Sequence, residues 1–342
     1  MQGSFDCAFP RGARECCAQD DNKRLRPLNP AFHLVFCGTP AFAVPTLEAL
    51  VKAGFSMDLV VTRPDKPKGR GMEMAVSPVK RASISLQLPI AQPETIKNNA
   101  DFRAQLEELN PEAMVVVGYG RIIPQWMIDL PPLGNINLHS SLLPKYRGAA
   151  PVQWAVACGE TVTGVTTMRI DAGLDTGNIL QQREIAIAAE DTTETLSPKL
   201  ATVGAELMVL TLLGLRNKTI RLKPQDHSRA SLAPILKKED GRIDFRRSAA
   251  EIHNRLRGFQ PWPGAYTSFR GKQIVICGAQ IAERIGSQPQ GSLLVENQRL
   301  FAACHDSFLE LLEIQPEGKK RMAARDFING YKPRAGEKLG AS

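Results

Sequence analysis

The chain has 342 residues and a formal net charge of +8, with 43% hydrophobic and 6% aromatic side chains. This balance excludes collagen-like, coiled-coil and disordered chains, and the length predicts two domains or one large one. Since no apolar run approaches the ~20 residues that a membrane helix requires, we expect no contact with a membrane. Seven cysteines without a C-x-x-C pair predict reduced thiols in the cytoplasm.

The charge is unevenly distributed along the chain. Residues 1–215 hold 20 basic and 22 acidic side chains, whereas residues 216–342 hold 23 basic and 13 acidic ones. Clustered Lys and Arg side chains neutralise phosphates and release counterions, so the C-terminal third is a candidate nucleic-acid interface. The alternative is that the excess charge serves only solubility.

The N-terminal part of the chain predicts one α/β domain behind a short extension. Residues 1–31 lack apolar periodicity and a signal-peptide core, so we expect a poorly ordered extension. From residue 32 onward, apolar strands alternate with helices, which predicts a Rossmann-like, doubly wound, mostly parallel sheet over residues 32–215. We expect strands at 33–37, 58–62, 113–117, 135–139, 164–170 and 179–187. We expect helices at 41–53, 77–86, 101–109, 150–158 and 196–215.

The pattern changes after residue 215. Residues 216–236 lose the helical periodicity and are predicted to form a linker. A capping box from Ser248 to Glu251 opens a helix, and five short strands follow at 265–269, 273–278, 292–296, 300–304 and 308–315. One helix with five short strands predicts a small OB-like β-barrel, here a basic one, over residues 237–342.

Polar residues at strand ends are the candidate site. In open α/β sheets ligands bind at the carboxyl ends of the strands, but Gly38-Thr39-Pro40 is not a dinucleotide fingerprint, and no P-loop is present. Asn137 and His139 are two positions apart, so their side chains lie on the same side of their strand. There an amide and an imidazole could stabilise an oxyanion and transfer a proton. A structural histidine is the alternative. Asp175 lies on a glycine-flanked turn, which could equally be an ordinary hairpin turn.

Several motifs in order resemble the formyltransferase family that uses 10-formyltetrahydrofolate. They are Phe36–Pro40, Asn137-Leu138-His139, Ser141-Leu142-Leu143-Pro144, Arg147-Gly148 and Gly173-Leu174-Asp175-Thr176-Gly177. Three further segments are similar to the members of this family that act on methionyl-tRNA. These segments are the loop Arg63–Gly71, the run Gly148–Pro151 and the run Phe259–Pro263. The similarity extends from about Phe32 to Tyr331.

The resemblance implies formyl transfer from 10-formyltetrahydrofolate to the α-amine of methionyl initiator tRNA, by direct attack of the amine, for initiation of translation. It places catalysis on Asn137, His139 and Asp175, with Asn137 and His139 stabilising the oxyanion and Asp175 and His139 handling the proton. It places folate contacts on Ser141, Leu142, Leu143 and Pro144, and tRNA contacts on Arg63, Lys66, Lys68 and Arg70. It implies a monomeric enzyme of the bacterial cytoplasm.

Two departures from the family pattern could tune the folate pocket: Ser140 replaces a glycine, and Lys145-Tyr146 replaces a basic residue followed by tryptophan. Direct transfer requires no covalent intermediate, so Cys37 and Cys158 are expected to be core residues. The histidines outside the triad show no ligand spacing, and no metal is expected.

Two rival functions remain. One is a folate-dependent formyltransferase that acts on a small amine, such as a glycinamide ribonucleotide or an amino sugar. The basic C-terminal region argues against it. The other is a non-catalytic RNA-binding protein, against which the intact Asn137, His139 and Asp175 argue.

Overall fold

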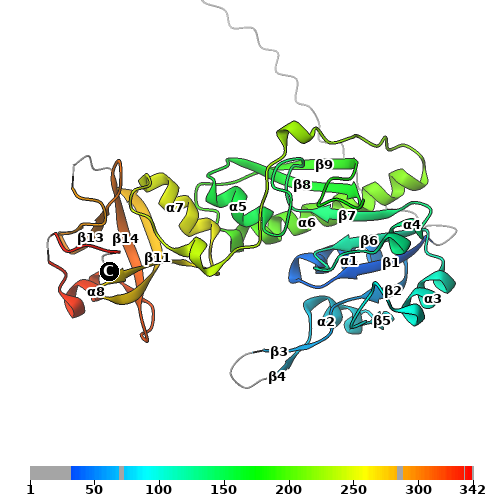
Figure 1. The fold of residues 1–342 in the computed structure, drawn as a ribbon, viewed down its shortest axis with the longest axis horizontal. Helices are drawn as coiled ribbons and strands as arrows, with labels where there is room; N and C mark the ends of the chain where they lie inside the picture. Colours follow the sequence, from blue (N-terminus) through cyan, green and yellow to red (C-terminus); the bar gives the residue numbers. More distant parts are fainter. Residues whose placement is uncertain (1–31, 69–72, 283–287, 335, 341–342) are drawn as a thin grey trace, which may run out of the picture.

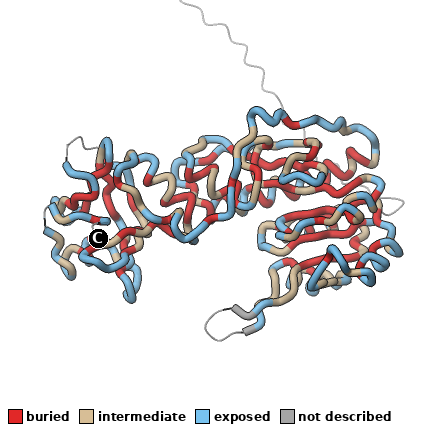
Figure 2. The backbone as a smooth tube through the Cα atoms, in the orientation of Figure 1, coloured by how far each residue is buried: buried red, intermediate tan, exposed pale blue. Residues whose placement is uncertain are grey.

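The computed structural model describes residues 32–68, 73–282, 288–334 and 336–340, so the predicted N-terminal extension lies outside the described residues. The chain forms an α/β unit and an antiparallel β unit, which lie beside each other along the long axis of the molecule (Figure 1). Buried residues run through both sheets and through the junction between the units (Figure 2). The expected fold class is confirmed.

The α/β unit is built on a seven-stranded sheet with strand order β5-β2-β1-β6-β7-β8-β9. The first five strands in this order are parallel, whereas β8 pairs antiparallel with both of its neighbours, β7 and β9. All five residues of the central β6 are buried, because helices cover both faces of a doubly wound sheet. The strands are β1 His33–Gly38, β2 Ser56–Val61, β5 Ile90–Ala91, β6 Ala113–Val117, β7 Asn135–His139, β8 Val162–Arg169 and β9 Ile179–Ala186.

Helices cover the two faces of this sheet according to the alternation of apolar residues along the strands. Leu34 and Phe36 of β1 join a core beneath α1 (Val44–Lys52) and α6 (Thr193–Arg216). Val35 and Cys37 point to the other face, beneath α3 (Ala100–Leu109) and α4 (Gln125–Asp129). Two further helices are α2 Pro78–Ser85 and α5 Pro151–Ala157.

The 24-residue helix α6 is long and apolar enough to cross a membrane, although the sequence had led us to expect no such segment. Its most apolar stretch is 56% buried inside the protein. Leu138 of β7 packs directly against Gly204 of this helix. These contacts are those of a core helix.

The structure adds β5 and α4 to the elements expected in the α/β unit, and it changes the segment after β2. The polar loop expected at Arg63–Gly71 contains β3 (Lys66–Lys68), which pairs with β4 (Glu73–Ala75) in an antiparallel hairpin. Two basic residues and a proline have low strand propensity, so the sequence pattern did not indicate this strand. Arg70 lies outside the described residues.

The C-terminal unit is an antiparallel sheet with order β10-β11-β14-β13-β12, to which β15 adds beside β14. The strands are β10 Ala265–Phe269, β11 Lys272–Ala282, β12 Leu293–Glu296, β13 Arg299–Ala303, β14 Phe308–Pro316 and β15 Met322–Ala323. The segment 336–340 joins the two edges, because Leu293 donates to Glu337 while Gly340 donates to Ser268. This bridge completes the expected small barrel, against which α7 (Ala249–Gly258) and α8 (Ala324–Tyr331) pack. In this unit the structure adds β15 and α8 to the expected elements.

The two units meet where α5 packs against α7. Gly258 is required at this contact, since a Cβ there would lie 2.6 Å from the backbone nitrogen of Ala157. Thr193 at the start of α6 donates a 2.6 Å hydrogen bond to the carbonyl of Gly258. The backbones of α5 and α7 are therefore in close contact at this junction.

Candidate active site

The carboxyl end of β7 carries the amide and imidazole that the sequence singled out. Asn135, Asn137 and His139 lie on the same face of the strand, and Asn135 is tied to the carbonyls of Met127 and Ile128. The side chain of Asn137 is partly exposed and makes no hydrogen bond to any residue that the structure describes. Its donor is available to a ligand.

His139 is held with a defined proton arrangement. Its side chain is 6% exposed, and Nε2 lies 2.8 Å from the carbonyl oxygen of Tyr146. A carbonyl oxygen can only accept, so Nε2 carries a proton in every charge state of the ring. Nδ1 then faces Oδ2 of Asp175 at 3.7 Å. Nδ1 is the ring atom that can take up and release a proton.

Asp175 reaches this imidazole from the loop between β8 and β9. Its Oδ2 accepts a 2.8 Å hydrogen bond from the backbone of Gly148, and its side chain is 16% exposed. Oδ1 has no hydrogen-bond partner among the described residues. The backbone of Asp175 has φ 51°, in the left-handed region that non-glycine residues rarely adopt. The structure thus brings His139 and Asp175 together, as expected.

The folate-contact residues predicted from the resemblance shape the loop that follows β7. Ser141 is fully buried, and its hydroxyl donates to the carbonyl of Lys145 at 2.6 Å. Leu142 packs over Gly164, and Leu143 packs against Met168 and Ile179. The peptide bond between Leu143 and Pro144 is cis. These contacts rigidify the loop, while its contact with folate stays a prediction.

Tyr146 has a structural role beyond the carbonyl that holds His139. Its hydroxyl donates to Glu160 at 2.8 Å, and Lys145 pairs with the same carboxylate. Burial, reinforced by the hydrogen bond to Glu160, raises the pKa of Tyr146 far above its usual value. The phenol therefore stays protonated and fixes this turn of the loop.

The basic residues predicted to contact tRNA occupy different places. Arg63 lies at the carboxyl edge of the sheet, where its guanidinium borders Gly120, and its buried Nε has no partner among the described residues. Lys66 is exposed in β3, where Lys68 also lies. Arg63 is therefore set apart from the hairpin itself.

The base of the hairpin is anchored by Asp65. Its carboxylate accepts from Lys80 at 2.5 Å and from Gln92 at 2.9 Å. The hydrogen bond from Lys80, helped by that from Gln92, lowers the pKa of Asp65. The hairpin thus projects from a charged anchor on the α/β unit.

The expectation that two thiols are core residues is confirmed for Cys37 and wrong for Cys158. Cys37 is fully buried, and burial raises its pKa to about 12, whereas Cys158 is exposed at the end of α5. Within the described part of the chain, no three His, Cys, Asp or Glu side chains converge as a metal site would require.

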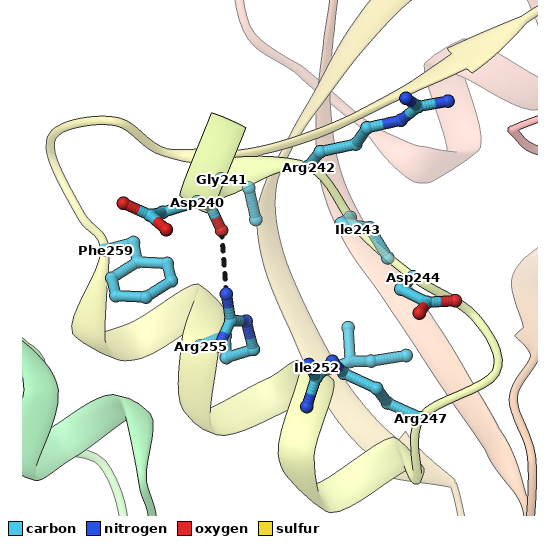
Figure 3. A pocket seen from close by; sticks show the side chains of 10 residues that line it. Asp240, Gly241, Arg242, Ile243, Asp244, Arg247, Ile252, Arg255 and Phe259 are labelled. Atoms are coloured by element: carbon cyan, nitrogen blue, oxygen red, sulfur yellow. Dashed lines mark hydrogen bonds between the residues drawn. The ribbon is translucent and has the colours of Figure 1, made fainter. Parts of the chain in front are cut away.

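A small pocket lies at the junction between the units (Figure 3). It is lined by residues of the stretch from Asp240 to Ala265, none of them from the cluster around His139. Arg255 enters it and donates to the carbonyl of Asp240 at 3.1 Å, and its guanidinium lies over the ring of Phe259. Internal contacts thus account for Arg255.

Sequence reasoning missed Gln225, which the structure places beside the Asp175 loop. Gln225 is 6% exposed, and its amide contacts Arg147, Asp175 and Gly177. It belongs to the segment 216–236, which the sequence indicated only as a linker, and a single glutamine in a polar run carries no detectable pattern. The backbone of Ser231 and Ala233 also pairs with Arg147.

An amide donor beside an imidazole–carboxylate pair meets two needs of acyl transfer, because the site can stabilise an oxyanion and accept a proton. The chain matches the formyl transferase family over residues 33–212 and the formyl transferase C-terminal domain over residues 235–332. The chain therefore belongs to the formyl transferase family.

Curated relatives define the branch of this family. The chain is 64% identical over 308 residues to the methionyl-tRNA formyltransferase of Koribacter versatilis, covering 90% of this chain and 98% of the relative. It is 59% identical over 309 residues to that of Acidobacterium capsulatum, covering 90% and 99%. It thus groups with the methionyl-tRNA formyltransferases.

A solved structure shares the fold. An N-formyltransferase from Helicobacter canadensis, in complex with folinic acid and dTDP-3-aminofucose, aligns with a TM-score of 0.63 at 21% identity. The alignment covers 83% of this chain and 99% of that one.

Proposed function

We propose that this chain transfers the formyl group of 10-formyltetrahydrofolate to the α-amine of methionyl initiator tRNA. The observation that carries the proposal is the cluster at the end of β7, where His139 and Asp175 lie 3.7 Å apart beside the available amide of Asn137. The close relationship to methionyl-tRNA formyltransferases supports this choice of amine.

Asn137 is the donor to the formyl oxygen. When the amine attacks the formyl carbon, negative charge develops on that oxygen, and a fixed amide N–H stabilises it without reorganisation of solvent. Asn137 offers this donor from the rigid end of a buried strand. His139 assists once it has taken up the proton of the amine, because its positive charge then lies on the same strand face as Asn137.

Asp175 and His139 manage the protons. The bond between amine and formyl carbon forms, the bond from that carbon to N10 breaks, the amine loses one proton and N10 gains one. Asp175 accepts the amine proton, and neutral His139 then takes it up at Nδ1, which faces Oδ2 of Asp175 at 3.7 Å.

The loop Ser141–Pro144 holds the folate. Its buried hydrogen bonds leave a rigid wall beside Asn137, so that the formyl carbon can be fixed within reach of the amide. The exposed side chain of Leu174, next to Asp175, adds an apolar surface at the same end of the sheet.

The basic C-terminal barrel and the basic residues of the segment 63–70, which are Arg63, Lys66, Lys68 and Arg70, hold the tRNA. Exposed basic side chains of the barrel include Lys272, Lys319, Lys320, Arg325 and Lys332. Cationic side chains on an open surface bind phosphates with a strong dependence on salt. We place the catalytic domain at residues 32–215, the linker at 216–236 and the tRNA-holding domain at 237–342, in a monomer of the bacterial cytoplasm.

The test is a formylation assay with methionyl initiator tRNA and 10-formyltetrahydrofolate. We expect transfer by the wild type and a loss of at least two orders of magnitude in kcat for Asn137→Ala, since one missing oxyanion donor costs about 3–4 kcal/mol. Gln125→Ala is a matched control, because its amide is exposed on α4 and donates to Asp129 of the same helix.

The rival functions give different results in the same assay. Wild-type protein that binds folate but leaves methionyl-tRNA unmodified would indicate a small amine as substrate. If both the wild type and Asn137→Ala bind tRNA without formylating it, the chain is a binding protein, and the proposal is overturned.

A further inference from the structure

Gln225 makes four hydrogen bonds through one buried amide. Its Nε2 donates to the carbonyl of Asp175 at 2.9 Å and to that of Gly177 at 2.7 Å. Its Oε1 accepts from Nε and Nη2 of Arg147 at 3.1 and 2.6 Å. Every polar position of this amide is occupied, although the residue lies in the segment between the two units.

The chemistry of the partners allows only one orientation of this amide. A guanidinium can only donate, so Oε1 must face Arg147, and carbonyls can only accept, so the NH₂ group must face Asp175 and Gly177. A carboxylate at position 225 would keep the contact with Arg147 but would direct an oxygen at two carbonyl oxygens. An aliphatic side chain would make none of these four hydrogen bonds and would leave the two carbonyls without the amide donor.

Arg147 fixes the same site from its other side. It is buried, and its Nη2 also lies 3.2 Å from Nδ1 of His227, which must accept the bond. The next residue, Gly148, donates its backbone N–H to the carboxylate of Asp175. Gly148 has φ 119°, and a Cβ there would lie 2.7 Å from the carbonyl oxygen of Ala233. The Asp175 backbone and carboxylate are thus both tied to the pair Arg147-Gly148.

These ties hold a conformation that Asp175 would not adopt unaided. A left-handed backbone at a non-glycine residue is strained, and it persists only where surrounding contacts impose it. The preceding residues Asp171–Leu174 are exposed. The two hydrogen bonds from Gln225 are therefore made at the point where the exposed loop returns to the buried sheet.

We infer that Gln225 is a positioning residue, which, clamped by Arg147, sets the backbone of Asp175 and hence the distance from its carboxylate to His139. The inference rests on the proposed role of Asp175. It makes the segment between the domains a part of the catalytic apparatus, because it supplies the contact that completes the Asp175 loop.

The experiment compares Gln225→Glu with a matched buried amide. Asn135→Asp is that control, since Asn135 also directs its NH₂ at two backbone carbonyls but at the opposite end of β7 from His139. We expect Gln225→Glu to lower kcat by about 10- to 100-fold, the effect of a misplaced reacting group. KM for folate and for methionyl-tRNA should stay within about twofold, and the pH profile of kcat should shift.

Hydrogen exchange gives a readout that needs no substrate. Without substrates, the backbone amides of residues 171–178 should exchange faster in Gln225→Glu than in the wild type. In Asn135→Asp the same amides should exchange at the wild-type rate. Gln225→Leu serves as a second variant if Gln225→Glu folds poorly.

The outcomes separate this inference from the proposed function. An inactive wild type would refute the function, while the exchange comparison would still test the tie to the loop. An active wild type with unchanged kcat in Gln225→Glu would overturn the inference. The inference would also be overturned if Asn135→Asp, at the same loss of stability as Gln225→Glu, showed the same fall in kcat.

Discussion

The indole of Trp154 meets the ring of Phe259 edge to face across the junction of the two units, with centroids 5.3 Å apart and planes at 82°. Trp154 also donates its N–H to the carbonyl of Pro234, and the guanidinium of Arg255 lies 4.8 Å from the centre of the Phe259 ring. An aromatic pair of this geometry adds about 0.5–1.5 kcal/mol beyond the burial of area. The relative position of the units thus depends on this pair.

Phe259→Ala should therefore weaken the junction. The lost ring is fully buried and should cost about 3–5 kcal/mol of unfolding free energy, measured by urea titration. We expect the KM for methionyl-tRNA to rise severalfold while folate affinity stays unchanged, because the ring is remote in sequence and in packing from the β7 cluster. An equal loss of folate affinity would contradict this division of labour.

The exposed pair Lys319 and Lys320, in the turn after β14, should contribute to tRNA affinity through phosphate contacts. When both residues are changed to Gln, the plot of log tRNA affinity against log salt concentration should have a shallower slope. Each lost contact with duplex RNA should reduce the slope by roughly 0.7–0.9. Filter binding over a range of KCl concentrations measures it. An unchanged slope would place the tRNA on another face of the barrel.

Glu310 should make the C-terminal barrel sensitive to acid. Its side chain is 8% exposed, and the hydrogen bonds from Arg299, together with that from Gln280, lower its pKa below the ordinary 4.5. A lowered pKa in the folded state stabilises the protein above pH 4.5, and this stabilisation disappears as the pH falls through the folded-state value.

The comparison of wild type with Arg299→Met measures this effect. The variant should be less stable at pH 7, and the difference in unfolding free energy should shrink as the pH falls below 4.5. A difference that is constant across this range would show that Arg299 stabilises the barrel only through packing.

The cysteines provide a test of the core assignment. At pH 7.5, iodoacetamide should modify Cys158, which is exposed, and leave Cys37 and Cys304 unmodified in the native protein. Burial raises the pKa of both protected thiols to about 12, and the thiolate is the reactive form. Peptide mass spectrometry measures the labelling, with protein unfolded in urea as the control. Modification of Cys37 in the native state would contradict its placement in β1.

Sequence patterns predict this structure well where local strand geometry decides it. The apolar run at 113–117 predicted the buried β6, and the alternation at 135–139 predicted that Asn137 and His139 share a face of β7. These features are local, since strand geometry alone fixes which side chains point the same way. The hairpin of β3 and β4 was not predicted, because pairing between two short polar strands leaves no periodic pattern.

The sequence by itself determined the two units, the amide and imidazole at the end of β7, and the motifs that indicate the family. Only the tertiary structure decided what completes the site. It gave His139 its fixed Nε2 proton, through the carbonyl of Tyr146, and it brought Gln225 from the inter-domain segment to the Asp175 loop. These are hydrogen bonds between backbone carbonyls and distant side chains, and a backbone carbonyl is identical at every position of a sequence.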